Sequence, residues 1–217
     1  MKHKLEADSI QLAFNNRTIL SDIYIKSETG KITALLGRNG QGKTCLMQII
    51  YGSLECEKSV RFDNISNRNA YKKPELIKYL PQFNFIPKQL SLKRMFNDFE
   101  LDYIEFEKKF PEFSSKHKSS IGILSGGEKR LIELYVIVKS KSHFAILDEP
   151  FTHLNPIQIE NVKALLTEEK ANKSLLITDH MFNHVTEIAD SIYVLTNGKT
   201  HLINDLKEIE MLGYAKI

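Results

Sequence analysis

The sequence predicts one α/β domain with a mostly parallel β-sheet core, an antiparallel β-layer at the N-terminal end and a small helical subdomain. Three observations indicate this fold. Apolar and polar residues alternate through much of residues 4–36, which is typical of half-buried strands. After residue 30, strand-length apolar runs alternate with helical patterns, which favours a parallel sheet. Eight aromatic residues gather between Phe83 and Phe113, where we expect the helical subdomain.

Composition limits the possible classes of protein. The 217 residues suffice for one large α/β domain. The net charge of +3 gives no strong case for a nucleic-acid partner and none against a mildly acidic partner. Two cysteines, Cys45 and Cys56, do not form a disulfide framework and fit a reducing compartment. Residues 1–9 lack the apolar core of a signal peptide, and no apolar run is long enough to span a membrane. We therefore expect a cytoplasmic protein that reaches a membrane only through a partner.

The N-terminal layer is predicted from alternating runs of residues. Its expected strands lie at 5–14, in part of 19–25 and at 59–65. Asn15-Asn16 between the first two is a hairpin turn signal. A polar loop is expected at 64–74, followed by a short strand at 77–80.

A phosphate-binding loop is the clearest motif in the chain. The apolar run 32–36 predicts a buried strand, residues 37–44 fit the pattern Gly-x4-Gly-Lys-Ser/Thr, and the apolar run 46–50 has helical length. Glycines let the backbone come close to a ligand. The backbone N–H groups of residues 39–45 can then face an anion at the helix start. The alternative is a glycine-rich turn that binds nothing, which the flanking strand and helix disfavour.

This motif assigns roles to individual residues within a P-loop NTPase core. Lys43 would place a positive charge near the β- and γ-phosphates, and the Thr44 hydroxyl would be a ligand of Mg2+. The loop residues predicted to bind the nucleotide are Asn39, Gly40, Gly42, Lys43, Thr44 and Cys45. Cys45 is also expected to pack as a small hydrophobe.

A helical insert is expected after Pro81. Pro87 and Pro111 bracket a helical pattern, with Ser91 as a candidate N-cap. The apolar face of this pattern consists of Leu92, Met95, Phe96 and Phe99. We expect the helical subdomain to cover 82–123 and the core to be formed by 1–81 and 124–217, all within one domain.

The second half of the chain alternates helices and strands. The expected elements are a helix at 128–138, a strand at 143–147, a helix at 156–166, a strand at 174–178, a helix at 181–189, strands at 191–196 and 199–203, and a helix at 204–211. Asn197-Gly198 between the last two strands is a strong hairpin signal.

Two adjacent carboxylates follow the apolar run 144–147. In a parallel sheet both would emerge at the carboxyl edge, where ligands of open α/β folds bind. Asp148 would hold Mg2+, and Glu149 would position or deprotonate a water that attacks the γ-phosphate. The alternative is a pair of solvated acids at a strand end. The phosphate-binding loop upstream favours the site.

A second helix start begins at Leu124-Ser125-Gly126-Gly127-Glu128. A serine and two glycines entering a helix can accept an anion. The alternative is an ordinary helix start, with Ser125 as N-cap and Glu128 completing a capping box, and both can hold at once. Two phosphate-binding helix starts in one small domain make sense if the second faces the nucleotide of another copy.

In this order, the phosphate loop 37–44, Gln82, the stretch 124–128, Asp148-Glu149 and His180 resemble the nucleotide-binding domain of an ATP-binding-cassette (ABC) ATPase. The resemblance covers nearly the whole chain. It implies a single ABC ATPase domain that pairs head to tail with a second one around two ATP molecules and Mg2+.

The resemblance also implies residue roles. Phe14 would stack on adenine, the alternative being a core aromatic. Gln82 would contact Mg2+ and link the site to the helical insert, the alternative being an exposed loop amide. Ser125 and Gly127 would contact the partner's γ-phosphate. Glu149 would be the catalytic carboxylate, and His180 would contact the γ-phosphate and orient the attacking water.

The segment after Glu149 departs from the family pattern. Asn155 stands where the family usually has Asp, and it keeps a hydrogen-bonding tip but loses a charge. Phe151 and His153 are bulkier than usual. These changes bear on communication across the dimer more than on ATP binding. The region 52–81 and the insert are short, which suggests a small or unusual membrane partner.

The leading hypothesis is a stand-alone ATPase subunit of an ABC transporter. Its expected partners are a second ATPase subunit, in a homodimer, and a separately encoded transmembrane permease that docks at the aromatic insert beside Gln82. It would then be peripheral on the cytoplasmic face of the membrane. The alternatives are a soluble ABC ATPase in repair, chromosome organisation or translation, a P-loop kinase, and a non-hydrolysing nucleotide switch.

Overall fold

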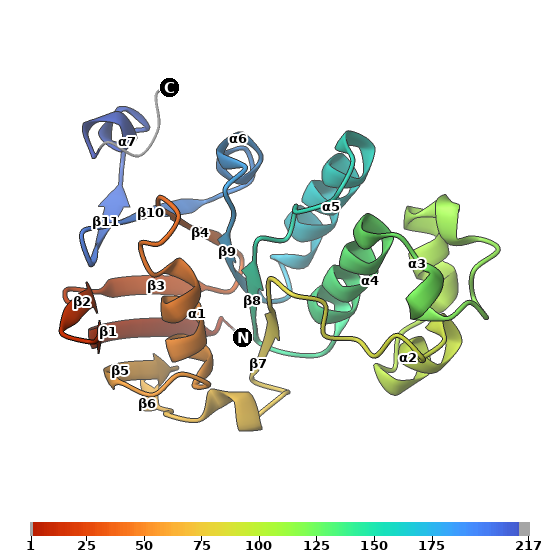
Figure 1. The fold of residues 1–217 in the computed structure, drawn as a ribbon, viewed down its shortest axis with the longest axis horizontal. Helices are drawn as coiled ribbons and strands as arrows, with labels where there is room; N and C mark the ends of the chain where they lie inside the picture. The colour runs from red at the N-terminus through yellow and green to blue at the C-terminus, as the bar shows by residue number, and fades with distance from the viewer. Residues whose placement is uncertain (1, 213–217) are drawn as a thin grey trace.

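The computed structural model describes residues 2–212, and its strands form two sheets (Figure 1). The first sheet is antiparallel and contains β1 (Lys4–Phe14), β2 (Arg17–Leu20), β3 (Tyr24–Glu28), β5 (Glu57–Phe62) and β6 (Ile65–Ser66). Its order is β2-β1-β5-β6, with β3 also paired to β1. The predicted antiparallel N-terminal layer is therefore confirmed.

The second sheet is mostly parallel, as predicted. It contains β4 (Ile32–Leu36), β7 (Ile77–Leu80), β8 (Phe144–Asp148), β9 (Ser174–Thr178), β10 (Ser191–Thr196) and β11 (Lys199–Ile203). Its order is β11-β10-β4-β9-β8-β7, and all pairs are parallel except the β10–β11 hairpin. The carboxyl ends of β4, β8 and β9 consequently lie at one edge, where the phosphate loop, the two acids and His180 follow them.

The helices differ in length and position. They are α1 (Lys43–Tyr51), α2 (Leu92–Asp98), α3 (Tyr103–Lys109), α4 (Gly126–Lys139), α5 (Pro156–Glu169), α6 (Phe182–Thr186) and α7 (Lys207–Met211). Short 3-10 turns lie at Ala70–Lys72, Pro111–Phe113 and Ile121–Ile123.

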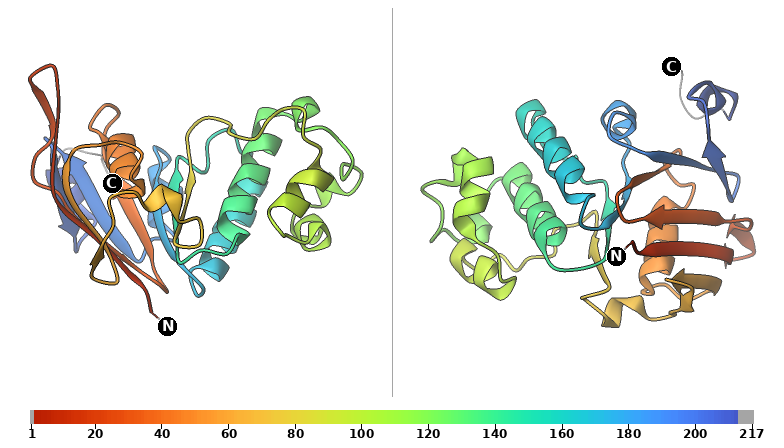
Figure 2. Two further views of the ribbon diagram at one scale, coloured as in Figure 1. Left: turned by 90° about the horizontal axis from the view of Figure 1, so that it is seen from below. Right: turned by 180° about the vertical axis from the view of Figure 1, so that it is seen from behind.

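The parallel sheet is covered on both faces by apolar side chains. Ile32, Ala34 and Leu36 of β4 join the cluster formed with α4 and α5, whereas Leu35 joins the cluster formed with α1 and the antiparallel sheet. Strand residues alternate between faces, so one strand supplies both cores. Helix α1 is thus held between the two sheets, which fixes the loop at its start (Figure 2).

The segment between β7 and α4 lies at one end of the molecule, beyond α4 (Figures 1 and 2). Ser91 caps α2 by accepting a hydrogen bond from the Arg94 amide at 3.3 Å, as predicted. The aromatic rings of Phe96, Phe106 and Tyr135 pack against one another within 6.0 Å between centroids. Most aromatic residues of the insert therefore form its own core and its contact with α4.

Two predicted strand boundaries in the N-terminal half were wrong. The strand expected at 19–25 is interrupted, because the amides of Ser21 and Asp22 donate to the carbonyl of Gly198 at 2.9 and 3.2 Å. The strand expected at 59–65 ends at Phe62, because Asp63 and Asn64 turn with φ of 52° and 66° and start β6.

Two predicted helices are shorter in the structure. The helix expected at 181–189 is regular only in α6, because the chain leaves the helix after Thr186: the Ile188 amide donates to the Val185 carbonyl at 3.2 Å, and the Asp190 amide donates to the Ile32 carbonyl at 2.8 Å. The helix expected at 204–211 begins at Lys207, whose amide donates to the Asp205 side chain at 2.9 Å.

Candidate active site

The phosphate loop connects β4 to α1. Gly42 precedes the helix with φ of 100°, and a Cβ atom there would lie 2.8 Å from Cγ2 of Ile19. Both facts require glycine at this position. Within the described residues, no side chain caps the start of α1 and no acidic residue lies in its first turn. Its first backbone N–H groups are therefore available to an anion.

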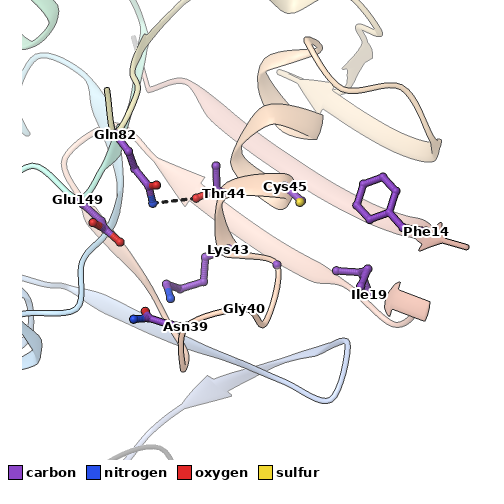
Figure 3. Close-up of a pocket in the computed structure, with 10 residues that line it drawn as sticks. Phe14, Ile19, Asn39, Gly40, Lys43, Thr44, Cys45, Gln82 and Glu149 are labelled. Carbon is purple, nitrogen blue, oxygen red and sulfur yellow. Dashed lines mark hydrogen bonds between the residues drawn. The ribbon is translucent and has the colours of Figure 1, made fainter. Parts of the chain in front are cut away.

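The loop opens onto a cavity of about 490 Å³. The cavity is lined by Phe14, Ile19, Asn39, Gly40, Gly42, Lys43, Thr44, Cys45, Gln82 and Glu149. Figure 3 shows Phe14 and Ile19 at one end and Gln82 and Glu149 at the other. Phe14 is 48% exposed, so a face of its ring is open to a flat ligand. The volume lies within the range usual for small-molecule sites.

Lys43 is almost fully buried beneath this loop. Its ammonium donates to the carbonyls of Gly37 at 2.7 Å and Arg38 at 3.3 Å. Burial lowers the pKa of Lys43, and the negative charges of Glu149, Asp148 and Asp179 oppose that shift. A second set of negative charges on a bound phosphate would further favour the protonated amine.

Thr44, Gln82 and Asp148 converge beside Lys43. The Gln82 amide donates to the Thr44 hydroxyl at 3.0 Å and to the Asp148 carboxylate at 3.3 Å (Figure 3). The Tyr79 hydroxyl donates to the other Asp148 oxygen at 3.1 Å. Burial raises the pKa of Asp148, and these hydrogen bonds oppose the rise. Hydroxyl, amide and carboxylate oxygens are the donors that Mg2+ prefers, so this set fits the ion.

Glu149 and His180 meet across the ends of β8 and β9. Glu149 has φ of 52°, and its amide donates to the Thr178 carbonyl at 2.7 Å. One oxygen of its carboxylate lies 3.7 Å from Nδ1 of His180 and 3.5 Å from the Thr152 hydroxyl. This geometry brings a carboxylate that can accept a proton next to an imidazole and a hydroxyl.

The second helix start is exposed at the tip of α4. Ser125 and Glu128 form the predicted capping box, with hydrogen bonds of 3.2 and 2.8 Å. A Cβ atom on Gly127 would lie 2.5 Å from the carbonyl oxygen of His153, so only glycine fits. The tip opens onto a second cavity, of about 590 Å³. That cavity is lined by Glu112, Ser125, Gly127, Glu128, His153, Asn155, Ile157 and Gln158.

The departures from the family pattern have structural consequences. Asn155 is the N-cap of α5 and accepts a hydrogen bond from the Gln158 amide at 2.9 Å. The N-cap is therefore kept although Asn lacks the charge of Asp. Phe151 is fully buried, whereas His153 is exposed with φ of 67°. The bulk of Phe151 therefore adds to the core and leaves the surface unchanged.

Four residues of this region were not predicted from the sequence. Ile19 lines the cavity, and Tyr79 holds Asp148. Asp179 is fully buried and accepts the Phe151 amide at 3.0 Å. Arg130 reaches the backbone of both acids. Two of them, Arg130 and Asp179, could have been found from the sequence, because each is a charged residue inside or next to an apolar run.

The fold and this arrangement of loop lysine, strand-end acids and histidine define a P-loop enzyme that binds and hydrolyses ATP. A family model described as ABC transporter matches residues 20–152, more than half of the chain. The chain belongs to the ABC transporter family, as an ATP-binding and ATP-hydrolysing subunit. The predicted fold class, family and ATPase function are thereby confirmed, and the kinase alternative is set aside.

Named relatives align over almost the entire chain. The lipopolysaccharide export system ATP-binding protein LptB of Acidithiobacillus ferridurans is 26% identical over 224 residues, which cover 96% of this chain and 93% of the relative. LptB of Escherichia coli (strain K12) is 28% identical over 215 residues, covering 92% and 88%.

Solved structures share the fold. The structure of an ATP-binding subunit of an ABC transporter has a TM-score of 0.79 at 22% identity, covering 97% of this chain and 95% of that one. A nucleotide-free ATP-binding cassette from an ABC transporter has a TM-score of 0.77 at 23% identity, covering 97% and 94%. Among residues 2–212, no helix combines the length and apolar character needed to cross a membrane.

Proposed function

We propose that this subunit works in a head-to-tail pair, closes on two ATP molecules with Mg2+ and drives a separate transmembrane subunit. The observation that carries this proposal is the separation of the two phosphate-facing helix starts. The starts of α1 and α4 open onto different cavities, and no described residue lines both. A single triphosphate can reach both starts only if the second belongs to another molecule.

The first cavity supports a nucleotide pose that runs along its length. Adenine would stack on Phe14, and the phosphates would lie on the loop N–H groups of Asn39, Gly40, Gly42 and Cys45. The Lys43 ammonium would then exchange carbonyl partners for β- and γ-phosphate oxygens. Thr44, Gln82 and Asp148 would hold Mg2+, which when bound offsets the charge of the phosphate oxygens.

Hydrolysis would fall to Glu149 and His180, whose side chains lie 3.7 Å apart. Glu149 would take the proton of the attacking water, and His180 would orient that water against the γ-phosphate. Ser125 and Gly127 of the second copy would complete the site. The Ser125 hydroxyl accepts from the Glu128 amide, and in the closed pair it would turn its own proton to a phosphate oxygen.

The helical segment 82–123 would act as a subdomain against the core formed by 1–81 and 124–217. Phe83 and Ile123 are 68% and 77% exposed, although most aromatic residues of the insert are buried in its core. Such exposed apolar side chains suit the apolar face of a helix from a transmembrane subunit. This docking would hold the protein at the cytoplasmic face of a membrane, with no nucleic-acid partner. The names of the two relatives, which denote export ATP-binding proteins, support the transport role.

The Glu149→Gln variant tests this proposal. It should abolish ATP turnover but leave ATP binding intact, because the amide cannot take a proton yet keeps the shape of the side chain. With ATP and Mg2+ it should elute as a dimer in size-exclusion chromatography. Lys43→Ala is the control and should lose both ATP binding and ATP-dependent dimer formation. A Glu149→Gln variant that hydrolyses ATP at the parent rate, or that stays monomeric with ATP bound, would contradict the proposal.

A further inference from the structure

Helix α4 carries two buried charged residues beneath the loop that contains Gln82. Arg130 and Glu133 are 2% and 1% exposed, and their neighbours Leu131, Ile132 and Leu134 are fully buried apolar residues. Three residues apart, the two charged side chains share one face of the helix. Burying charge is costly unless hydrogen bonds compensate for the lost water. The partners of these two side chains therefore indicate what they do.

Arg130 joins α4 to the backbone of the catalytic edge. Its guanidinium donates to the Pro81 carbonyl at 2.6 Å, directly before Gln82. The other terminal nitrogen donates to the carbonyls of Asp148 and Glu149, the latter at 2.8 Å. One side chain thus holds the residue before the glutamine and both strand-end acids. It bonds to main-chain atoms only, so it fixes position and leaves the reacting side chains free.

Glu133 holds the other end of the same loop. One oxygen of its carboxylate accepts the amides of Phe85 at 2.9 Å and Ile86 at 3.2 Å. Between these two attachments, residues 82–84 are exposed. Helix α4 therefore binds the loop 81–86 at both ends, through two side chains that lie about one helical turn apart. Gln82 and Phe83 lie between these two attachments and are exposed.

These attachments leave hydrogen-bonding capacity unused. Within residues 2–212, Nε of Arg130 and Oε2 of Glu133 are buried without a hydrogen-bond partner. Burial lowers the pKa of Arg130 and raises that of Glu133.

We propose that Arg130 and Glu133 form a two-point clamp that makes the loop 81–86 and the backbone of Asp148 and Glu149 move with α4. The proposal rests on the proposed function, because the tip of α4 carries Ser125 and Gly127. Seating that tip on the γ-phosphate of the second copy would displace a rigid helix, and the clamp would pass the displacement to Gln82 and Glu149. Arg130 and Glu133 are positioning residues, since neither side chain reaches the first cavity.

Kinetics of matched variants test the clamp. Glu133→Leu and Arg130→Met remove the hydrogen bonds at similar volume, and each should lower kcat by about 10- to 100-fold, the size expected for a misplaced catalytic group. Each substitution should change the KM for ATP less than twofold. When it is added to the Glu149→Gln variant, it should also change that variant's affinity for ATP less than twofold. Glu133→Gln keeps one acceptor oxygen and should retain most of kcat. Ile132→Val removes a buried methyl group from the same helix turn and should leave kcat unchanged.

Hydrogen–deuterium exchange gives a readout that a merely structural role would not move. In the Glu149→Gln background, ATP with Mg2+ should change the exchange of the Phe85 and Ile86 amides. In the Glu149→Gln/Glu133→Leu double variant, these amides should exchange faster than in Glu149→Gln, and their exchange rates should be the same with and without ATP. A nucleotide response that survives Glu133→Leu, or a Glu133→Gln variant as impaired as Glu133→Leu, would overturn the clamp.

The two failures can be told apart. If Glu133→Leu and Arg130→Met hydrolyse ATP at the parent rate while Glu149→Gln does not, the clamp is wrong and the proposed function stands. If neither clamp variant folds, Glu133→Gln and the exchange of Phe85 and Ile86 in the Glu149→Gln parent still decide the question.

Discussion

The close approach between Gly127 and His153 gives a prediction whose size follows from the coordinates. A Cβ atom at residue 127 would lie 2.5 Å from the His153 carbonyl oxygen, and ordinary contact begins at 3.4 Å. The loop around His153 would therefore have to retreat by about 0.9 Å. That loop is constrained on both sides, because Phe151 is bonded to Asp179 and Asn155 caps α5. Strain rather than simple relaxation should result.

Gly127→Ala should lower the free energy of unfolding by about 1–3 kcal/mol, the usual cost of overpacking. For a chain of this length, that corresponds to a fall in Tm of about 2–12 °C. Gly126→Ala is the matched control, because no described atom lies within 4 Å of the Cβ position there. The control should be neutral or gain up to about 1 kcal/mol. Differential scanning calorimetry of both variants measures the difference, and equal Tm values would refute the steric argument.

Two further predictions follow from single side chains. Tyr79→Phe removes the hydroxyl bonded to Asp148, so half-maximal ATPase activity should require about two- to tenfold more Mg2+, as expected for one net hydrogen bond; an unchanged Mg2+ titration would count against this link. Partial burial under the stacked His3 ring, and then the charge of His3, lower the pKa of His143. The unfolded chain therefore binds more protons there, and Tm should fall as the pH drops below about 6.5. In His143→Phe that fall should be smaller, and an identical pH profile of Tm would exclude the effect.

Local chemistry explains what could be predicted from the sequence. The capping box depends on Ser125 and Glu128, which are three positions apart, and the hairpin turn depends on the adjacent pair Asn197-Gly198. The phosphate loop likewise combines an apolar strand, glycines and a helix start within a short stretch. Each of these motifs carries its own physical cause, so the structure reproduces it at the expected positions.

Contacts between distant segments explain the rest. The break near Ser21 depends on the Gly198 carbonyl, and after the shortened helix α6 the Asp190 amide donates to the distant Ile32 carbonyl at 2.8 Å. Neither signal lies within reach of a local pattern. Ile19 lines the cavity beside Gly42, where an added Cβ atom would lie 2.8 Å from Cγ2 of Ile19. The role of Arg130 likewise depends on Pro81 and Glu149, which the fold brings to one helix.

Mixing two inactive variants tests most directly the claim that each ATP site is shared by two copies. In Lys43→Ala every phosphate loop is disabled, and in Ser125→Arg every α4 tip is blocked by a bulky cation on an exposed position. A head-to-tail pair with one chain of each kind keeps one intact site. Equal amounts of the two variants should therefore restore about one quarter of the parent ATPase rate if the copies pair at random, and up to about one half if only mixed pairs form. If Ser125→Arg alone hydrolyses ATP at the parent rate, or the mixture stays as inactive as its components, the shared site is contradicted.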